Sequence, residues 1–132
     1  MRWALPQAEI RIWGRNPQAA RALAQASGDV ACERVEQALR DADVVCTTTA
    51  SLTPIARRDA FAPGCHVNAV GSSRPVAREL DAETIAAAAL FVDRRDAALV
   101  EAGEIVHALQ AGAITPAHVL AELGDVLAGR HP

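Results

Sequence analysis

Two short runs rich in hydroxyl groups and glycine follow apolar segments and have the chemistry to hold a ligand. Thr47-Thr48-Thr49 comes at the end of the apolar run 43–47, and Gly71-Ser72-Ser73 follows the apolar run that ends at Val70. Such β-branched runs predict buried strands, and open α/β sheets bind ligands at the carboxyl ends of their strands. Glycine also lets a ligand come close to the backbone. We therefore interpret the stretch 65–81, which contains the second of these turns, as the floor of a nucleotide site.

Other reactive residues are scattered and indicate no further site. Cys32, Cys46 and Cys65 are odd in number and have no CxxC spacing, which argues against a disulfide framework and a zinc site, and favours buried, reduced thiols. His66 lies within a predicted buried strand, and we interpret it as a hydrogen-bonded core residue. No histidine or carboxylate spacing indicates a metal, so none is expected.

Composition narrows the class of protein. The 132 residues are 51% hydrophobic but only 3% aromatic, so alanine, valine and leucine must build one core, as in an α/β domain. The net charge of -3 and the lack of a basic cluster argue against nucleic acid as a partner. No apolar run approaches the roughly 20 residues of a membrane span, and no signal peptide is recognisable. We expect a cytoplasmic protein without a membrane partner.

The elements that must position these turns alternate along the chain. Strands are predicted at 9–13, 30–32, 43–47, 66–70 and 90–93. Asn16-Pro17 predicts a helix start and Ser27-Gly28 its end, because Asn caps free amides and Pro tolerates the first helical position. Further helices are predicted at 33–40, after a cap at Asp81, and at 96–102, while 105–109 is ambiguous. The helix after Asp81 should begin with a hydrophobic staple between Leu80 and Ile85, and its alanines (86–89) suggest that it packs close to the sheet.

A last helix is predicted after Thr115-Pro116. Its apolar residues follow the 3.6-residue period of a helix, and they are Val119, Leu120, Leu123, Val126 and Leu127. The alternation of strands and helices predicts an α/β protein with a parallel sheet covered on both faces. No Gly-x-Gly-x-x-Gly turn follows any of the strands, so the usual phosphate-binding fingerprint is missing.

The assembled motifs resemble the ornithine cyclodeaminase and mu-crystallin family. The matching segments are IWGRNP (12–17), ADVVCTTT (42–49), PGCHVNAVG (63–71), RELD (78–81), VD (92–93), AAL (97–99) and AELGDVLAG (121–129). One such motif is weak, but their order and spacing agree over nearly the whole chain.

The resemblance implies a partial Rossmann fold, a doubly wound parallel sheet that lacks its first strand and Gly-rich turn. Residues 1–132 would form an incomplete NAD(P)-binding domain, and the N-terminal domain for dimerisation and substrate binding would be absent. The missing strand would lie between 9–13 and 43–47. The chain would then be a fragment, a mis-started product or a degenerate copy. We expect it to have poor stability alone and no activity as a fragment, because unpaired backbone groups are costly when buried.

The resemblance also assigns a cofactor site. Gly14-Arg15-Asn16 would lie at the adenosine ribose, where an acidic residue binds the 2′-hydroxyl of NAD and an arginine accommodates the 2′-phosphate of NADP. NADP is therefore favoured and NAD is possible; a solvated arginine beside a helix cap is the simpler alternative. Thr47, Thr48 and Thr49 would line the dinucleotide. The last contacts, near the nicotinamide, would come from Val70, Gly71 and Ser72.

Ser73 separates the activities found within the family. The cyclodeaminases have an Asp acid/base at this position, and a neutral serine cannot transfer a proton as a carboxylate does. The sequence Ser73-Arg74-Pro75 instead resembles the mu-crystallin branch. The full-length protein would then be an NAD(P)H-dependent ketimine reductase, acting on C=N or CH–NH bonds of small imino or amino acids as a homodimer. Alternatives are an alanine dehydrogenase, an ornithine cyclodeaminase, a non-catalytic nucleotide-binding module and a structural remnant.

Overall fold

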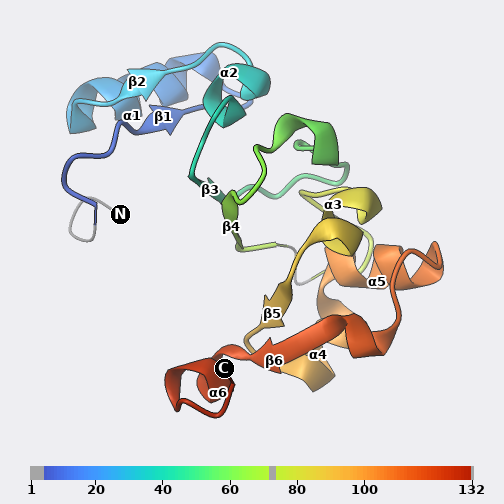
Figure 1. Ribbon diagram of the computed structural model, residues 1–132. Helices are drawn as coiled ribbons and strands as arrows, with labels where there is room; N and C mark the ends of the chain where they lie inside the picture. The colour runs from blue at the N-terminus through green and yellow to red at the C-terminus, as the bar shows by residue number, and fades with distance from the viewer. Residues whose placement is uncertain (1–4, 72–73, 132) are drawn as a thin grey trace. The chain divides into compact units, whose positions relative to one another are not determined.

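The computed structural model describes residues 5–71 and 74–131, and the chain forms two compact units (Figure 1). Unit 1 is Met1–Ala42 and unit 2 is Asp43–Pro132.

Unit 1 is a strand–helix–strand motif followed by a short helix. β1 (Arg11–Ile12) pairs in parallel with β2 (Val30–Ala31), and α1 (Pro17–Ser27) connects them; α2 (Val35–Leu39) follows. The Asn16 side chain accepts hydrogen bonds from two amides of the first turn of α1, and Gly28 ends the helix with a φ of 72°. The predicted start and end of this helix are confirmed, because both depend on local chemistry alone.

Unit 2 begins with a second parallel pair. β3 (Val44–Thr47) pairs with β4 (His66–Ala69), and the connection between them contains the short 3₁₀ helix η1 (Arg58–Ala60). Beyond residue 73, Leu80 forms a parallel bridge with Ala56 of that connection. The chain after β4 thus returns to the segment before it.

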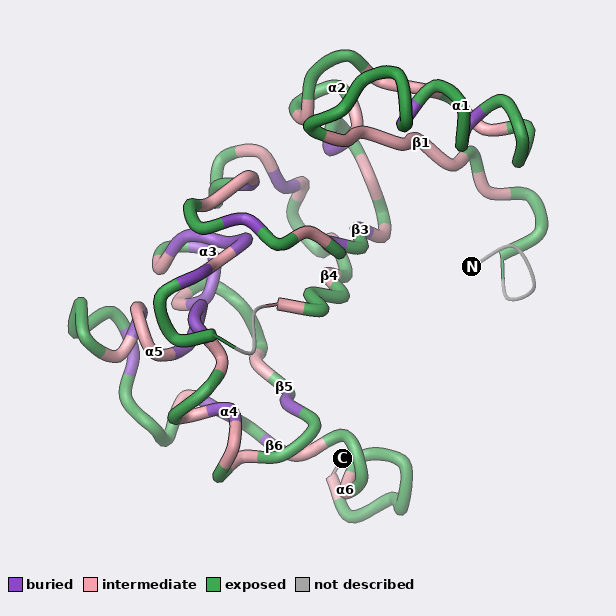
Figure 2. Tube along the Cα trace, turned by 180° about the vertical axis from the view of Figure 1, so that it is seen from behind, coloured by how far each residue is buried: buried purple, intermediate pink, exposed green. Residues whose placement is uncertain are grey.

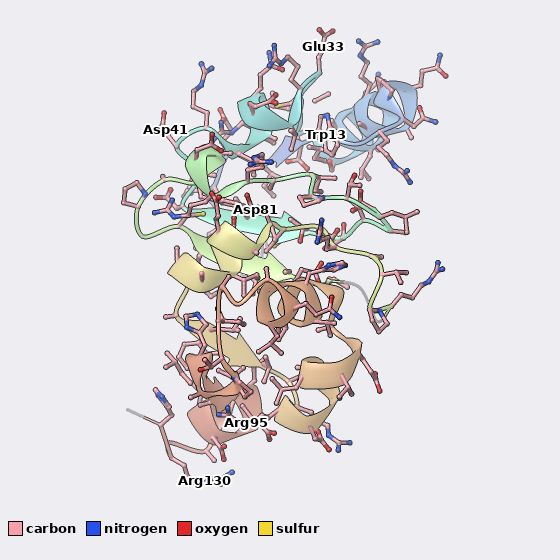
Figure 3. The ribbon with its side chains drawn as sticks, turned by 90° about the vertical axis from the view of Figure 1, so that its right-hand side faces the viewer. Trp13, Glu33, Asp41, Asp81, Arg95 and Arg130 are labelled. Atoms are coloured by element: carbon pink, nitrogen blue, oxygen red, sulfur yellow. The ribbon has the colours of Figure 1, made fainter. Side chains whose placement is uncertain are left out.

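The helices of unit 2 follow that bridge. α3 (Ala82–Ala87) begins at Asp81, whose carboxylate accepts the Thr84 amide hydrogen at 2.9 Å. Asp81 is labelled in Figure 3. Leu80 and Ile85, on either side of this cap, are both buried, which confirms the predicted hydrophobic staple. α3 contacts α5 (Gly103–Gln110) and η1, rather than lying close against a sheet as its alanines suggested.

The carboxyl-terminal part of unit 2 differs from the prediction. β5 (Leu90–Val92) and α4 (Arg95–Glu101) are present as expected, and α5 resolves the ambiguous segment as a helix. The predicted last helix is wrong over its first half. Pro116–His118 is a 3₁₀ turn (η2), Val119–Glu122 is a strand (β6) parallel to β5, and only α6 (Leu123–Leu127) is helical. Pairing with β5 has overridden the helical period.

Glycine at position 103 allows a close approach between two segments of unit 2. A Cβ atom there would lie 1.7 Å from the Ala77 carbonyl oxygen and 2.9 Å from that of Arg74. The segment 74–77 therefore passes directly against the start of α5, and only a residue without a side chain fits.

The fold class is α/β, as predicted, and each strand pair is parallel. Among the described residues these pairs form three two-stranded sheets, rather than five strands hydrogen-bonded in one sheet. None of the helices in the described segments is both long and apolar enough to cross a membrane.

β4 was predicted as a buried strand, and this is wrong for the side chains. His66, Asn68 and Ala69 are exposed, and Val70, just after the strand, is 75% exposed. Figure 2 shows this strand mostly in the colour of exposed residues. An apolar run reports the tendency to pair as a strand, whereas burial depends on what packs over its faces.

Candidate functional site

The carboxyl ends of β3 and β4 bring two of the predicted ligand-binding turns together. The strands are in register, with Thr47 opposite Ala69, and the Val70 amide donates to the Thr47 carbonyl at 2.9 Å. The threonine run and the Val70-Gly71 turn therefore leave the sheet side by side. Strand pairing alone accounts for this, because parallel strands end at the same edge.

A buried carboxylate connects these two turns. Glu79 has no solvent exposure. Its Oε2 accepts from the Thr47 hydroxyl at 2.7 Å and from the Gly71 amide at 3.0 Å, while its Oε1 accepts from the Thr49 amide. A buried carboxylate is costly unless donors satisfy it; here each donor comes from a residue next to the strand ends.

The backbone of Glu79 is held as firmly as its side chain. Its carbonyl accepts from the amides of Ile55 and Ala56 at 2.8 and 3.3 Å, and its amide donates to Glu104 Oε1 at 2.7 Å. Glu104 is itself 4% exposed, in the first turn of α5. The position of the Glu79 carboxylate is thus fixed from three different segments of unit 2.

These bonds decide which groups of the predicted cofactor site remain available to a ligand. The Thr47 hydroxyl and the Thr49 amide donate to Glu79, and the Thr49 hydroxyl accepts from the Ser51 amide at 3.3 Å. Thr48 and Val70 instead are exposed. The two threonines flanking Thr48 therefore support the loop, and Thr48 and Val70 present surface to solvent.

Gly71 is required by both its conformation and its surroundings. Its φ is 69°, in the left-handed region that glycine adopts without strain. A Cβ atom would lie 3.1 Å from Glu104 Oε2. The predicted close approach of a ligand at this glycine is untested. Ser72 and Ser73, the remaining residues singled out in this turn, lie outside the described residues.

Gly14, Arg15 and Asn16 follow β1 in unit 1. Asn16 Oδ1 accepts from the amides of Gln18 and Ala19 at 3.0 and 3.1 Å, so its oxygen serves as the helix cap. Arg15 is exposed, and no hydrogen bond or ion pair of its side chain exists among the described residues. At Gly14 a Cβ would meet only Ala20 Cβ, at 3.9 Å.

The fold does not require glycine at position 14, because an added Cβ would make only an ordinary contact. Arg15 has no side-chain partner among the described residues, and its guanidinium is a planar donor of the kind that matches a phosphate.

The histidines and cysteines form no catalytic arrangement among the described residues. His66, predicted to lie in the core, is exposed, and its Nε2 lies 3.2 Å from Asn68 Oδ1. The three cysteines are free, but none is buried as predicted; Cys46 is exposed and the others are partly exposed. Burial, with the charge of Asp43 second, raises the pKa of the Cys65 thiol. No group of three potential ligands for a metal ion occurs in the described segments.

Glu79 is the site residue that the sequence analysis missed. It appeared there only as one letter of the RELD motif. The sequence carries no signal for it, because both Arg78 and Glu79 stand between Ala77 and Leu80, and the burial of these two apolar neighbours is known only from the fold. A charged residue at a buried position is rarely tolerated without specific partners.

Comparisons of this chain with family models and with curated proteins agree on one family. The family model described as "Ornithine cyclodeaminase/mu-crystallin family" matches residues 2–132. The ketimine reductase mu-crystallin of Macropus fuliginosus is 42% identical over 126 residues, covering 94% of this chain and 38% of the relative. The Delta(1)-pyrroline-2-carboxylate reductase of Paracoccus denitrificans is 33% identical, covering 89% of this chain and 39% of the relative.

Solved structures agree with these relatives. Thermococcus litoralis Delta(1)-pyrroline-2-carboxylate reductase, in complex with NADH and L-proline, has a TM-score of 0.88 and 27% identity; the match covers 98% of this chain and 43% of that one. The iminosuccinate reductase of Paracoccus denitrificans in complex with NAD+ has a TM-score of 0.82 and 29% identity, covering 94% and 39%. The chain thus spans about two fifths of the length of these relatives.

Proposed function

Because the chain belongs to the ornithine cyclodeaminase/mu-crystallin family, we propose that it is the nucleotide-binding portion of an NAD(P)H-dependent imine reductase. The observation that carries this proposal is the similarity, over nearly all of its length, to a ketimine reductase and to pyrroline-2-carboxylate reductases. Residues 1–132 would then contribute one Rossmann-like domain to a longer protein. We further propose that the whole protein is a cytoplasmic homodimer, as the resemblance implies.

The proposed cofactor is NADP(H), with NAD(H) as the alternative. Bound structures among the similar proteins contain NADH or NAD+, so the choice of NADP rests on this chain's own residues. The exposed guanidinium of Arg15, which has no partner among the described residues, favours NADP, because an acidic residue at this position would repel a 2′-phosphate. Asn16 supports that position by capping α1.

When bound, the reduced nicotinamide supplies a hydride, and the protein's task is to orient it and exclude competing reactions. In unit 2 we propose that Thr48 and Val70 contact the dinucleotide, because both are exposed just beyond the paired strand ends. Thr47, Thr49 and Gly71 would hold that surface in place through Glu79.

The proposed substrate is a small imino acid whose C=N bond is reduced to an amine. Ser73 supports reduction over cyclodeamination, because a serine cannot replace the carboxylate acid/base that a deaminase needs near neutral pH. An alanine dehydrogenase activity stays within the same proposal, because it also transfers hydride at a carbon–nitrogen bond. A non-catalytic nucleotide-binding module remains the alternative.

Substitution of Arg15 tests the choice of cofactor. In fluorescence titrations of the chain with NADPH and NADH, we expect Arg15→Asp to weaken NADPH binding by about 10- to 100-fold, the range that losing a hydrogen bond to a charged group produces. NADH affinity should change by less than about threefold, because NADH lacks the 2′-phosphate. Arg40→Asp is the matched control, since Arg40 is also exposed in unit 1. Equal losses for both nucleotides in Arg15→Asp would contradict the assignment.

Turnover tests the reaction. A longer natural product containing this chain should oxidise NADPH when Δ1-pyrroline-2-carboxylate is supplied, and should release no ammonia from L-ornithine. The first result depends on hydride transfer and the second on the absence of an acid at position 73. Ammonia release without NADPH oxidation would contradict the reductase and support a cyclodeaminase. If neither reaction occurred but NADPH still bound, the result would favour a non-catalytic nucleotide-binding module.

A further inference from the structure

We propose that Glu79 is a positioning residue of the cofactor site. Its buried carboxylate joins the residues at the ends of β3 and β4 and so fixes the conformation of the two loops that form the site. This inference rests on the proposed function, and it adds a residue that never touches the ligand. The loop residues Thr47 and Thr49 and the turn residue Gly71 all donate to this one carboxylate.

The chemistry of these contacts requires a carboxylate. Two of the three donors are backbone amides, which can donate but never accept. Both oxygens of Glu79 are therefore used as acceptors, one by the Thr49 amide and the other by the Gly71 amide. A glutamine has the same shape but offers one acceptor oxygen and one NH₂ donor, so at least one amide would face another donor.

The arrangement also removes these two amides from competition for a ligand. A loop with free backbone amides at the end of a strand attracts any anion. Here the Thr49 and Gly71 amides are already satisfied inside the protein. Among the described residues of these loops, Thr48 and Val70 are exposed to solvent. Glu79 thus fixes where these two residues stand, and with them the surface offered to the nicotinamide end of the cofactor.

Glu104, in the first turn of α5, contacts both Glu79 and the turn at Gly71. Its Oε1 accepts the Glu79 amide at 2.7 Å, and its Oε2 would lie 3.1 Å from a Cβ atom at Gly71. α5 therefore backs both the carboxylate and the turn that it holds. A shift of Glu79 would therefore move the turn at Gly71 in two ways, through the Glu79 carboxylate and through the Glu79 amide bound to Glu104.

The test compares Glu79→Gln with two controls in the 132-residue chain. Glu101→Gln makes the same chemical change at an exposed position of unit 2. Val92→Ala removes packing from the buried part of β5 without touching a donor to Glu79. Three quantities are measured for each variant: the NADPH dissociation constant by fluorescence, the hydrogen exchange rates of the Thr49 and Gly71 amides by NMR, and the melting temperature.

We expect Glu79→Gln to raise the NADPH dissociation constant by about tenfold, because apparent affinity falls with the fraction of molecules whose loops are correctly placed. Exchange at the Thr49 and Gly71 amides should accelerate by a similar factor, roughly tenfold. Val92→Ala should lower the melting temperature but change the dissociation constant by less than about twofold at temperatures well below melting. Glu101→Gln should change none of the three quantities.

Thr47→Val keeps the proposal testable if Glu79→Gln does not fold. It removes one donor and leaves both amides on the carboxylate, so the dissociation constant should rise by about two- to threefold. Where both variants fold, this effect should vanish in the Glu79→Gln background, because the two residues act as one unit.

The outcomes separate this inference from the proposed function. Unchanged NADPH affinity and unchanged exchange in Glu79→Gln would overturn the positioning role while leaving the cofactor assignment intact. The positioning role would also be overturned if Val92→Ala and Glu79→Gln lowered the melting temperature equally and weakened NADPH binding equally. A wild-type chain that binds neither NADPH nor NADH would contradict the proposed function, and with it any role of Glu79 in a cofactor site.

Discussion

Glycine at position 71 meets two separate requirements, one from its backbone and one from its neighbour. The φ of 69° strains any residue with a side chain, by about 1–2 kcal/mol. The Glu104 carboxylate, 3.1 Å from where a Cβ would stand, is held by the Glu79 amide and cannot move freely. Substitution at this turn therefore has a steric cost in addition to the conformational one.

Gly71→Ala and Gly64→Ala together measure that steric cost. Gly64 also lies in unit 2, with a φ of 79°, but nothing lies within 4 Å of its added Cβ. We expect Gly64→Ala to lower the free energy of unfolding by about 1–2 kcal/mol and Gly71→Ala to lower it further. Urea unfolding followed by circular dichroism gives both values. Equal losses would mean that Glu104 moves aside without cost.

Among the elements, α4 depends on a partner distant in sequence. The Arg95 amide at its start donates to Glu122 Oε1 of β6 at 2.8 Å. The Arg95 side chain reaches the carbonyls of Pro116 and Leu120 at 3.3 and 3.4 Å; Arg95 is labelled in Figure 3. The first turn of α4 is thus fixed to the segment that the sequence analysis predicted as a helix.

Glu122→Ala tests this connection. A lost cap typically costs about 1 kcal/mol, so we expect a loss of that size in unfolding free energy. The amide of Arg95 should also exchange faster. Glu101→Ala, at the exposed end of the same helix, is the control. If Glu122→Ala leaves the Arg95 exchange rate unchanged, β6 does not hold the start of α4.

Comparison of these elements shows what local sequence can predict. The starts of α1 and α3 were predicted because Asn16 and Asp81 act on amides two or three residues away. β6 was not predicted, since Val119 and Leu120 satisfy a helical period and their pairing with β5 joins residues far apart in sequence. The turns of the site were predicted from Thr47 and Gly71, but their common acceptor Glu79 could not be located without the fold.

At the scale of the molecule, the two units differ in how much apolar surface supports them. The buried apolar residues of unit 1 among the described residues are Ala20, Ala24 and Leu39, whereas unit 2 buries several larger ones, such as Phe61, Ile85 and Ile105. Hydrophobic stabilisation scales with buried apolar area, at about 25 cal/mol per Å². Unit 1 therefore has the smaller reserve of stability.

This difference predicts a sequence of unfolding events. Native-state hydrogen exchange should show the amides of α1 opening at lower urea than those of α5. Addition of NADPH should raise the protection of α1, if Arg15 and Asn16 contribute to binding as proposed. A single urea midpoint for amides of both helices would mean that the units unfold together.

The contact at Gly103 has a consequence for how this protein tolerates genetic change. An added Cβ would meet the backbone carbonyl of Ala77, at 1.7 Å, rather than the flexible end of a side chain. In a saturation-mutagenesis selection, every amino-acid replacement at position 103 should therefore be depleted, including the change to alanine, whereas synonymous glycine codons should persist. Second-site suppressors should be rare, because replacing a side chain elsewhere does not remove a main-chain oxygen. Position 103 should thus accept glycine alone.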